Sequence, residues 1–536
     1  MDRAEEGGFF EGDCKYEFAD NQDITPLDSS TRVVTPQTEA ASQEFVLSYN
    51  AIKWTTSIPL DLDAGMKELR HEFLLALCKP GVEEPLSVVE LASRYLGFLA
   101  TQIEPSKYPS LDLQVLEFLL DRFEDEILLG SEIHAFFASL PDALRRSDII
   151  SCYYLALEAV KRPLFSSATE SALFRAASHA QARIFAVFGG QGNTLTYLDE
   201  LRSLYTIYPS MIRPFLSVTT VHLSQLAGAS SGVAQHFEHG MHVLRWLENP
   251  DTQPDADYLI GAPVSFPIIG LAQLAHVVVM CSILGIHPGQ LRDHLAGVTG
   301  HSQGIVTAVV VAASDDWDSF VKHAKDALTV LFWIGVRGQQ AYPCPAIPQE
   351  AMEDAEKHGE GAPTSALCLR GLPCAEVERY VETANKHLPA DKRVAIGLVN
   401  SPRNLVVTGP PLSLYGLCRL LRDAQAPADF DDSRVRFSQR KRRFVKHFLP
   451  ITAPFHSPYL EEAAHRLRED LKSIEISSKE LRIPLYSTCT GQDMRVELQS
   501  ENIVPLLIKL IVSNFIESHL SNGRRSFEVV ILQAVM

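Results

Sequence analysis

The chain has 536 residues, too many for a single hydrophobic core, so two or three compact units with connecting segments are expected. Apolar residues make up 46 % and charged residues 21 %, which excludes a collagen-like, coiled-coil or wholly disordered chain. The formal net charge of −18 argues against a general affinity for nucleic acid or for an anionic membrane.

The cysteines and the apolar segments bear on the cellular compartment. Nine cysteines are widely scattered and form no C-x-x-C pair, which favours a reducing compartment without a disulfide framework or a structural zinc. The first 18 residues are acidic and lack the basic and apolar regions of a secretory signal. Residues 258–286 are strongly apolar but contain Pro263, Pro267, Gln273 and His276. We interpret them as buried strand and helix, not a membrane span, and expect a cytoplasmic protein.

The first third of the chain predicts an arm followed by helices. Residues 1–50 are polar and acidic without sustained periodicity, which is typical of a mobile arm. Apolar residues then recur at helical spacing, which predicts a helical N-terminal domain over residues 51–180 with a structural or partner-binding role. The residues that carry this spacing are Met66, Leu69, Phe73, Leu77, Val88, Leu91, Tyr95, Phe98, Leu116, Leu119, Leu120 and Phe123.

From residue 181 the pattern predicts an α/β body. The apolar run Ile184–Phe188 leads into the glycine turn Gly189-Gly190-Gln191-Gly192, as a buried strand that opens into a turn would do. Similar runs at residues 264–270 and 295–300 suggest further strands. A doubly wound or hydrolase-like α/β body over residues 181–362 fits this alternation.

Residues 363–452 predict a smaller inserted subdomain. Strand-like runs at residues 365–369, 394–399, 404–408 and 448–452 alternate with helical patterns at 374–387 and 412–424. This β-α-β-β-α-β order is ferredoxin-like. The body is then expected to resume over residues 453–512, followed by an atypical C-terminus over residues 513–536.

A serine motif lies between a strand-like run and an apolar helix-like run. Gly300-His301-Ser302-Gln303-Gly304 matches G-x-S-x-G, with residues 295–300 before it and residues 305–313 after it. This placement is what a nucleophile elbow requires, because the glycines let the turn close and expose the serine oxygen at a helix N-terminus. We predict that Ser302 is a nucleophile. The alternative is a serine in an ordinary turn without a catalytic role.

A nucleophilic serine needs a base within hydrogen-bond reach. His456 stands out among 18 histidines, because Pro454-Phe455-His456-Ser457-Pro458 follows an apolar run and presents a side chain at a turn. The amides of Gln191, in the glycine turn, and of Gln303 are candidates for an oxyanion hole. A dinucleotide fingerprint is the rival for the glycine turn, but G-G-Q-G lacks the G-x-G-x-x-G spacing.

These three motifs together resemble the acetyl transferase domain of the fungal fatty acid synthase β subunit and the related starter-unit transacylase domains of fungal polyketide synthases. The resemblance extends in order through further segments, and residues 60–180 resemble the helical N-terminal region of the β subunit. The further segments are Trp246–Pro250, Gln273–His276, Ile334–Arg337, Ala341–Pro343, Leu398–Asn400, Asn404–Val407 and Gly409–Gly416.

The resemblance implies a ping-pong transfer of an acetyl starter in fatty acid biosynthesis. Ser302 would attack acetyl-CoA with His456 as base, and the phosphopantetheine thiol of acyl carrier protein would then take the acetyl group. In this family a backbone carbonyl orients the base, here from near Ser487 and Thr488. The implied partners are acyl carrier protein and a synthase α subunit in a hetero-oligomer, with no nucleic acid and no membrane. No intrinsic cofactor and no metal are expected, since acetyl-CoA is a substrate.

The resemblance also implies a substrate preference. Malonyl-selective relatives carry an arginine that pairs with the malonyl carboxylate, and that position falls on Ile334. Ile334 and His301 would then line the acyl pocket, and an aliphatic side chain there favours acetyl over malonyl. Arg337, three residues on, is interpreted as structural.

A basic run stands in this otherwise acidic chain and has two interpretations. It could face an acidic carrier protein or the phosphates of CoA, or it could be a solvated loop with charge partners near Asp431 and Asp432. Its members are Arg434, Arg436, Arg440, Lys441, Arg442, Arg443 and Lys446.

The C-terminus departs from the family pattern. The family continues into a strand ending in D-F-G-P-G-G and then into flavin and further domains, but this chain follows the pattern only to about Ile511. Residues 527–532 are β-prone and could fill the place of that strand. A truncated, catalytically incomplete β-subunit fragment is therefore one alternative. The others are a loading domain for a longer starter such as hexanoyl, and a serine esterase or thioesterase.

Overall fold

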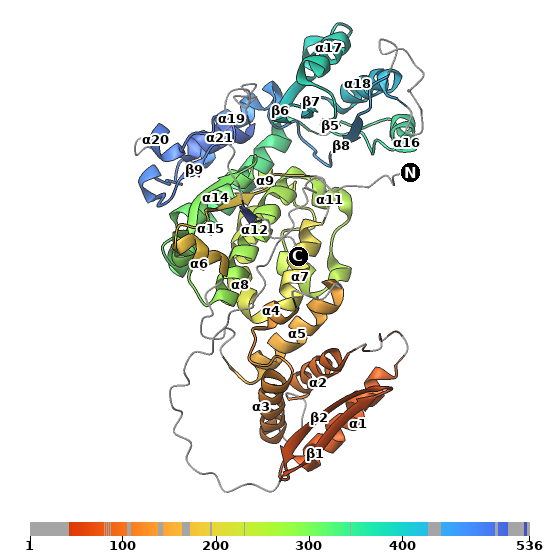
Figure 1. Cartoon of the computed structure of the whole chain (residues 1–536). Helices are drawn as coiled ribbons and strands as arrows, with labels where there is room; N and C mark the ends of the chain where they lie inside the picture. Colours follow the sequence, from red (N-terminus) through yellow and green to blue (C-terminus); the bar gives the residue numbers. More distant parts are fainter. Residues whose placement is uncertain are drawn as a thin grey trace. The chain divides into compact units, whose positions relative to one another are not determined.

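The computed structural model describes residues 42–79, 81, 83, 85, 87–103, 109–137, 143–162, 172–192, 196–229, 231–343, 345–426, 441–498, 502–512 and 530–532. The chain forms two compact units, Met1–Leu164 and Phe165–Met536 (Figure 1). The first 41 residues of the predicted arm lie outside the described residues. The seven described cysteines are free.

The first unit begins with a β-hairpin that the sequence analysis did not predict. Strands β1 (Ser42–Tyr49) and β2 (Ile52–Pro59) pair antiparallel, and Asn50 turns the chain with a φ of +53°. Phe45, Leu47, Trp54 and Ile58 are buried at alternate positions. The end of the predicted arm and the start of the predicted helical domain are therefore strands. A period of two over so few residues is easily missed beside the helical spacing of the next hundred residues.

Helices make up most of the rest of the described part of the first unit. Their apolar faces pack together, with Tyr95 and Phe73 in ring contact at 5.1 Å and Glu90, which is buried, paired with Arg94 and Arg145. The helices are α1 (Asp63–Leu77), α2 (Val88–Gln102), α3 (Pro109–Glu126), α4 (Ile133–Phe137) and α5 (Ala143–Ala159).

A parallel sheet organises the second unit. Its strand order is β10-β3-β4-β9, with β3 (Ile184–Phe188) and β4 (Leu295–Gly300) paired in parallel at its centre. Both central strands lie at the predicted positions. Strand β9 (Leu485–Tyr486) pairs with β4, and β10 (Val530–Leu532) pairs with β3, so the β-prone segment near the C-terminus supplies an edge strand. This α/β sheet confirms the predicted fold class of the body.

Helices surround this sheet (Figure 1). Helix α12 packs against α15, α7 and α8, and α14 packs against β4, β3 and α15. The helices before and after the sheet strands are α6 (Ala172–Ser178), α7 (Tyr197–Ile207), α8 (Pro209–Gly228), α9 (Ser231–Ala234), α10 (Val243–Glu248), η1 (Pro250–Thr252), α11 (Ala256–Ile260), α12 (Ala262–Leu284), α13 (Pro288–Asp293), α14 (Gly304–Ala313), α15 (Trp317–Ala341), η4 (Pro458–Leu460), α19 (Glu461–Asp470), η5 (Ser478–Glu480), α20 (Met494–Leu498) and α21 (Val504–Val512). Helix α16 (Gln349–Lys357) packs instead against the inserted subdomain, where its Ala355 joins the core.

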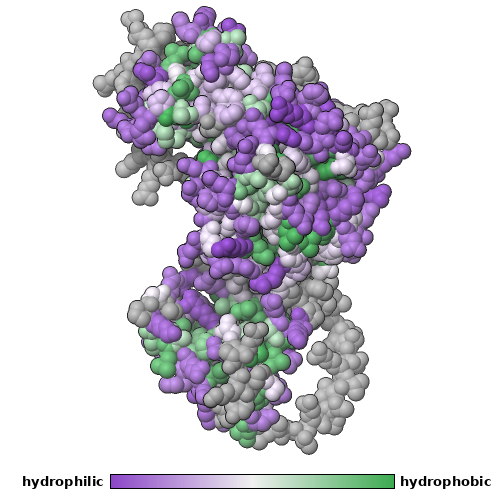
Figure 2. All heavy atoms as spheres, turned by 180° about the vertical axis from the view of Figure 1, so that it is seen from behind, coloured by the Kyte–Doolittle hydropathy of each residue, from purple (hydrophilic) through white to green (hydrophobic). Residues whose placement is uncertain are grey.

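Helix α12 corrects the prediction of a strand at residues 264–270. The segment is apolar on all sides, and a short run of this kind does not distinguish a buried strand from a buried helix. Pro263 is the second residue of the helix, where the amide lacks a helical partner, whereas Pro267 lies inside the helix and removes one backbone hydrogen bond. By length and composition α12 could cross a membrane, but 67 % of its most apolar window is buried inside the protein. On the face drawn in Figure 2, hydrophilic residues predominate and apolar residues form separate patches.

The inserted subdomain has the predicted ferredoxin-like topology. Its antiparallel sheet has the order β6-β7-β5-β8, formed by β5 (Ala366–Arg370), β6 (Ala395–Ser401), β7 (Asn404–Thr408) and β8 (Val445–Phe448). Helices α17 (Cys374–Asn385), η2 (Ala390–Lys392) and α18 (Pro411–Ala424) complete it.

The last strand of the insert lies earlier than the predicted run at residues 448–452. Strand β8 contains Lys446, a charged residue that does not fit the apolar pattern from which the strand was predicted. Its side chain is nevertheless buried, because the ammonium group pairs with Glu360 at 3.2 Å and also bonds the side-chain amide of Gln425. A paired charge of this kind can occupy a buried position.

Candidate active site

Ser302 lies at a sharp turn between strand β4 and helix α14. Its φ is +51°, a left-handed conformation that costs a residue with a side chain about 1–2 kcal/mol. Strained backbone of this kind concentrates at functional sites. The turn ends the central strand of a parallel sheet and places the serine at the N-terminus of a buried apolar helix, the arrangement that a nucleophile elbow requires.

The two glycines of the motif permit the close packing of this turn. A Cβ atom on Gly300 would lie 2.1 Å from the carbonyl carbon of Gly304. A Cβ atom on Gly304 would lie 2.3 Å from the carbonyl oxygen of Phe188, at the end of strand β3. Both distances are far below van der Waals contact, so larger residues would force the elbow away from the sheet. The G-x-S-x-G spacing is therefore explained by backbone contacts.

The structure brings His456 to Ser302, although 154 residues separate them in the sequence. The Nε2 atom of His456 lies 2.8 Å from the Oγ atom of Ser302, within hydrogen-bond distance. His456 also has a left-handed backbone, with a φ of +58°. Phe455 immediately before it packs on Phe266 of α12, with 4.5 Å between ring centroids. The side chain of His456, the predicted base, is thus held by its neighbours in a geometry suited to accept the serine proton.

Burial keeps this histidine neutral. Removal from water, with a smaller contribution from the nearby His301, lowers the pKa of His456 to about 3. Burial also lowers the pKa of His301. Near neutral pH both imidazoles are therefore uncharged, and the free lone pair of His456 is available to take a proton.

His301 connects the elbow to the inserted subdomain. Its Nε2 atom lies 2.9 Å from the side-chain oxygen of Asn400, at the end of strand β6. An amide oxygen only accepts hydrogen bonds, so this contact assigns the proton of neutral His301 to Nε2. Asn400 belongs to a segment that carries the family resemblance but was not predicted to be part of the site. Its position after a strand-like run was the signal that could have marked it.

Both predicted oxyanion-hole segments lie against Ser302. A Cβ atom on Gly190 would be 3.2 Å from the Cβ atom of Ser302, so the glycine turn packs directly on this serine. Gln303 is buried and forms the N-cap of α14. The backbone amides of Gln191 and Gln303 remain the predicted donors. The positive end of the helix dipole favours negative charge at this point.

Polar residues that the sequence analysis did not propose for the site hold the glycine turn. Ser265 accepts a hydrogen bond from the side chain of Gln191 at 2.9 Å. Gln273 donates to the carbonyl oxygen of Gly189 at 2.7 Å and accepts from the hydroxyl of Thr307 at 2.7 Å. Ser265 and Gln273 are polar residues on the otherwise apolar helix α12. That break in the apolar pattern was a usable signal.

The structure buries Ile334 completely on helix α15 and gives it no described contact with Ser302. Gly338, four residues later and therefore on the same face of the helix, abuts the ring of Phe455. The face that carries Ile334 is thus turned toward the segment of the base. Arg337 points elsewhere, because it forms a two-pronged ion pair with Asp470 at 2.6 and 2.8 Å. These contacts give Arg337 a structural role. The described hydrogen bond of His456 is the one to Ser302, so a contact from Ser487 or Thr488 stays a prediction.

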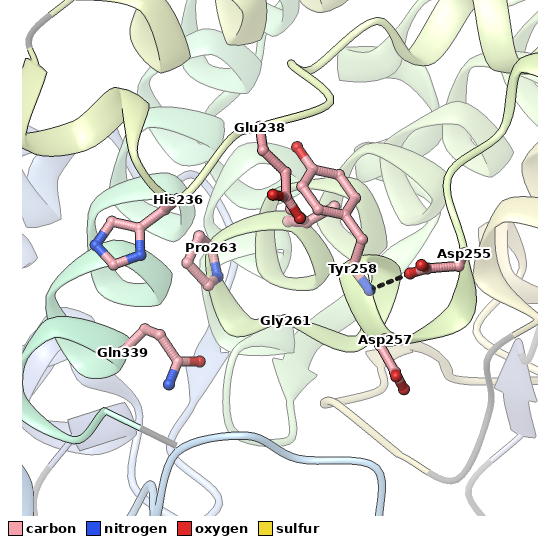
Figure 3. A pocket seen from close by; sticks show the side chains of 9 residues that line it. His236, Glu238, Asp255, Asp257, Tyr258, Gly261, Pro263 and Gln339 are labelled. Atoms are coloured by element: carbon pink, nitrogen blue, oxygen red, sulfur yellow. Dashed lines mark hydrogen bonds between the residues drawn. The ribbon is translucent and has the colours of Figure 1, made fainter. Parts of the chain in front are cut away.

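A pocket of about 310 Å³ opens beside the start of helix α12 (Figure 3). His236, Pro263 and Gln339 line one part of it, and Glu238 and Tyr258 line another. Gln339 accepts a hydrogen bond from Thr452 at 2.6 Å, and Thr452 in turn accepts one from the amide of Ala262 at 3.0 Å. These bonds connect α15, α12 and the segment that leads to His456.

The basic run is only partly described. Arg434, Arg436 and Arg440 lie outside the described residues. Lys446 is buried in its contact with Glu360, which contradicts its inclusion in a partner-facing surface. Arg442 is exposed and lies 3.5 Å from Glu376. Within the described part of the chain, no group of three or more His, Cys, Asp or Glu side chains could hold a metal ion.

Comparison with protein families matches two parts of the chain. The family described as starter unit:ACP transacylase in aflatoxin biosynthesis matches residues 186–456, about half of the chain. The family described as the N-terminal domain in fatty acid synthase subunit beta matches residues 42–160. The first match contains Ser302 and His456, and the second contains the hairpin and helices of the first unit.

Curated relatives match along most of this chain. It is 40 % identical over 486 residues to the fatty acid synthase subunit beta of Saccharomyces cerevisiae, covering 88 % of this chain and 24 % of that protein. It is 37 % identical to the fatty acid synthase beta subunit TOXC of Cochliobolus carbonum, covering 89 % of this chain and 23 % of that protein. The chain therefore spans about a quarter of the length of these relatives.

Solved structures match at lower similarity. MCAT from Streptococcus pneumoniae is 17 % identical with a TM-score of 0.40, and the match covers 62 % of this chain and 82 % of that one. A loading acyltransferase from the avermectin modular polyketide synthase is 19 % identical with a TM-score of 0.39, covering 62 % of this chain and 80 % of that one.

Proposed function

Because this chain belongs to the starter unit:ACP transacylase family and carries the N-terminal domain of fatty acid synthase β subunits, we propose that it transfers an acetyl starter from acetyl-CoA to acyl carrier protein. The observation that carries this proposal is the hydrogen bond of 2.8 Å between Ser302 and His456 at the elbow. It supplies an activated nucleophile in the part of the chain that the transacylase family matches.

In the first half-reaction the serine takes the acyl group. The Oγ atom of Ser302 attacks the thioester carbonyl while Nε2 of His456 accepts the serine proton. Backbone N–H groups of Gln191 and Gln303 donate hydrogen bonds to the oxyanion of the tetrahedral intermediate. Its collapse breaks the carbon–sulfur bond, and the CoA sulfur leaves with the proton held by His456. The product is an acyl ester on Ser302.

In the second half-reaction the acyl group moves to the carrier protein. The phosphopantetheine thiol gives its proton to His456 and attacks the ester carbonyl. The same amides stabilise the second oxyanion. Collapse then breaks the ester bond, and His456 returns the proton to the Oγ atom of Ser302. We propose that no bound cofactor takes part, because the proton transfers and the acyl shift need only these groups.

The buried environment suits this proton cycle. His456 starts neutral because burial lowers its pKa, so it accepts a proton without first losing one. Its charge appears only transiently, beside the oxyanion of opposite sign. The neutral state of His301 avoids a competing positive charge next to the base. A site arranged in this way favours the charged transition state over the resting state.

The choice of acetyl over malonyl rests on Ile334. This side chain is fully buried and aliphatic, on the helix face that reaches Phe455 beside the base. A malonyl carboxylate placed against it would lose water without gaining a partner, which costs several kcal/mol. An acetyl methyl group carries no such cost.

We expect acetyl-CoA to label the wild-type protein at close to one acyl group per chain, and malonyl-CoA to label it at least about 10-fold more slowly, because of that desolvation cost. The measurement is intact-protein mass after rapid mixing with acetyl-, hexanoyl- or malonyl-CoA, and then transfer to holo acyl carrier protein. Faster labelling by hexanoyl-CoA than by acetyl-CoA would contradict the acetyl proposal. Failure of all three to label the folded protein would contradict acyl transfer.

Exchanging Ile334 for arginine should reverse the preference. A guanidinium at this position can form charge-assisted hydrogen bonds with the malonyl carboxylate, and we expect the malonyl-to-acetyl rate ratio to rise about 10- to 100-fold. The measurement is the ratio of the two labelling rates. Ile334→Met is the matched control, since it keeps an apolar side chain of similar volume and should leave the ratio unchanged. An unchanged ratio in a folded Ile334→Arg protein would contradict the placement of Ile334 in the acyl pocket.

We also propose the partners and the location that the family relationship favours. An α subunit would assemble with this chain in a hetero-oligomer, acyl carrier protein would receive the acyl group, and the assembly would lie in the cytoplasm. The N-terminal domain of the β-subunit type supports the first of these proposals, and the transacylase family supports the second.

A further inference from the structure

We propose that Gln273 is a positioning residue that holds the two halves of the oxyanion hole in register, an inference that rests on the proposed acyl transfer. One half is the glycine turn after strand β3, which supplies the amide of Gln191. The other half is the start of helix α14, which supplies the amide of Gln303. Gln273 bonds to both segments from a third element, helix α12.

The carbonyl groups at the start of the glycine turn, those of Phe188 and Gly189, each accept a hydrogen bond. The oxygen of Phe188 accepts a hydrogen bond from the amide of His301 at 2.8 Å. The oxygen of Gly189 accepts one from the side-chain amide of Gln273 at 2.7 Å. Because peptide groups are planar, fixing the oxygen of Gly189 also fixes the N–H of Gly190, the residue directly before Gln191.

The other end of the Gln273 side chain is anchored to the nucleophile helix. Thr307 lies on α14, five residues after Ser302, and is only 1 % exposed. Its hydroxyl donates to the side-chain oxygen of Gln273 at 2.7 Å. The carbonyl of Gly189 can only accept, so the amide nitrogen of Gln273 must face it, and the oxygen is left for Thr307. A single planar amide thus bridges the two segments.

A second contact on the same helix supports this function for α12. Ser265, two turns before Gln273, is 1 % exposed and accepts a hydrogen bond from the side chain of Gln191 at 2.9 Å. Helix α12 therefore holds the glycine turn at both of its ends. Polar residues on a helix with so apolar a composition require partners when buried, and here the partners are the residues around the nucleophile.

The test uses reaction of Ser302 with a fluorophosphonate, which does not depend on the acyl group that the protein normally carries. The serine oxygen forms a bond to phosphorus, fluoride leaves, and His456 takes the serine proton. The phosphoryl oxygen gains negative charge at the position of the oxyanion, so the rate reports on the hole. Gln273→Met keeps the volume of the side chain but removes both hydrogen bonds, and we expect a loss of about 10- to 100-fold in the rate, as for a small misplacement of catalytic groups.

Variants at Thr307 and His276 supply matched controls. Thr307→Val removes the anchoring hydroxyl and should slow phosphonylation about 3- to 10-fold, whereas Thr307→Ser keeps the hydroxyl and should restore the wild-type rate. In the double variant Gln273→Met/Thr307→Val, the rate should fall little below that of Gln273→Met alone, because the two residues act as one unit. His276 lies one turn from Gln273 and bonds the Ala272 carbonyl of its own helix, so His276→Leu should leave the rate unchanged.

The outcomes separate this inference from the proposed function. A Gln273→Met rate within about twofold of wild type, or equal losses in Thr307→Val and Thr307→Ser, would overturn the positioning role. An equal loss in His276→Leu would also overturn it, since general damage to the helix would then suffice. Wild type that reacts with the fluorophosphonate but with no acyl-CoA would refute the proposed function. The phosphonylation rates of the variants relative to wild type would still test the positioning role of Gln273. Wild type inert toward the reagent would overturn both.

Discussion

Replacing Ser302 by alanine is expected to reduce acyl-enzyme formation by at least about 10⁴-fold. In the proposed mechanism the Oγ atom of Ser302 is the atom that forms the ester bond to the acyl group, and alanine lacks it. Alanine tolerates the left-handed backbone of this position about as well as serine does, so the protein should fold with an unchanged melting temperature. The measurement is labelling by radioactive acetyl-CoA, quantified per folded chain.

Two variants control the interpretation of this loss. Ser302→Cys keeps a nucleophile next to His456, and its label should be a thioester that neutral hydroxylamine removes quickly. Ser314 lies at the other end of helix α14, where its hydroxyl bonds the carbonyl of Val310, so Ser314→Ala should label like wild type. Label that persists in Ser302→Ala at the wild-type level would refute the nucleophile assignment.

Replacing His456 by glutamine should lower kcat/KM for acetyl transfer by about 10³-fold, within the range typical of the loss of a general base. Glutamine retains a polar side chain of similar size but cannot accept the serine proton.

The pH dependence of kcat/KM in the wild-type protein should also reflect the burial of His456. The pKa of His456 lies near 3 in the resting protein, so kcat/KM should stay flat between about pH 5 and 7.5. An acid limb centred near pH 6.5 would contradict a buried neutral base.

The same pKa shift predicts how stability depends on pH. The folded-state pKa lies below the unfolded value of 6.5, so the native state resists protonation. The stability linked to this group is fully present above pH 6.5 and is lost as the pH falls toward 3. Each pH unit below 6.5 corresponds to about 1.4 kcal/mol, or about 2 kcal/mol at pH 5. Urea unfolding at pH 7.5 and pH 5 should therefore show a smaller pH-dependent loss in His456→Gln than in wild type. Equal losses would contradict the shift.

The elements that the sequence predicted well are those with short-range signals. Strands β3 and β4 lie at the predicted residues, because each is a brief apolar run that leads into a glycine-containing turn. The ferredoxin-like insert was also predicted, since its strands and helices alternate with clear changes of period. The family relationship inferred from the colinear motifs is confirmed by the family matches.

Two of the errors have the opposite cause. The single helix α12 and the early position of β8 depend on contacts with distant residues, whereas the hairpin β1–β2 is a local element whose short period of two was missed beside the helical spacing that follows it. The apolar run at residues 264–270 becomes helical because α7, α8 and α15 surround it. Lys446 enters strand β8 because Glu360, 86 positions earlier, neutralises it.

The sequence by itself determined the elbow of this protein. Gly300 and Gly304 flank Ser302 within five residues, and the steric demands of that turn are local, so the motif specifies the geometry wherever the flanking strand and helix form. Only the tertiary structure decided what surrounds the nucleophile. His456 comes from 154 residues away, Asn400 from the insert, and Gln273 from a helix whose periodicity marks it as core. Which side chains meet is set by the packing of whole elements, and a local pattern carries no record of that packing.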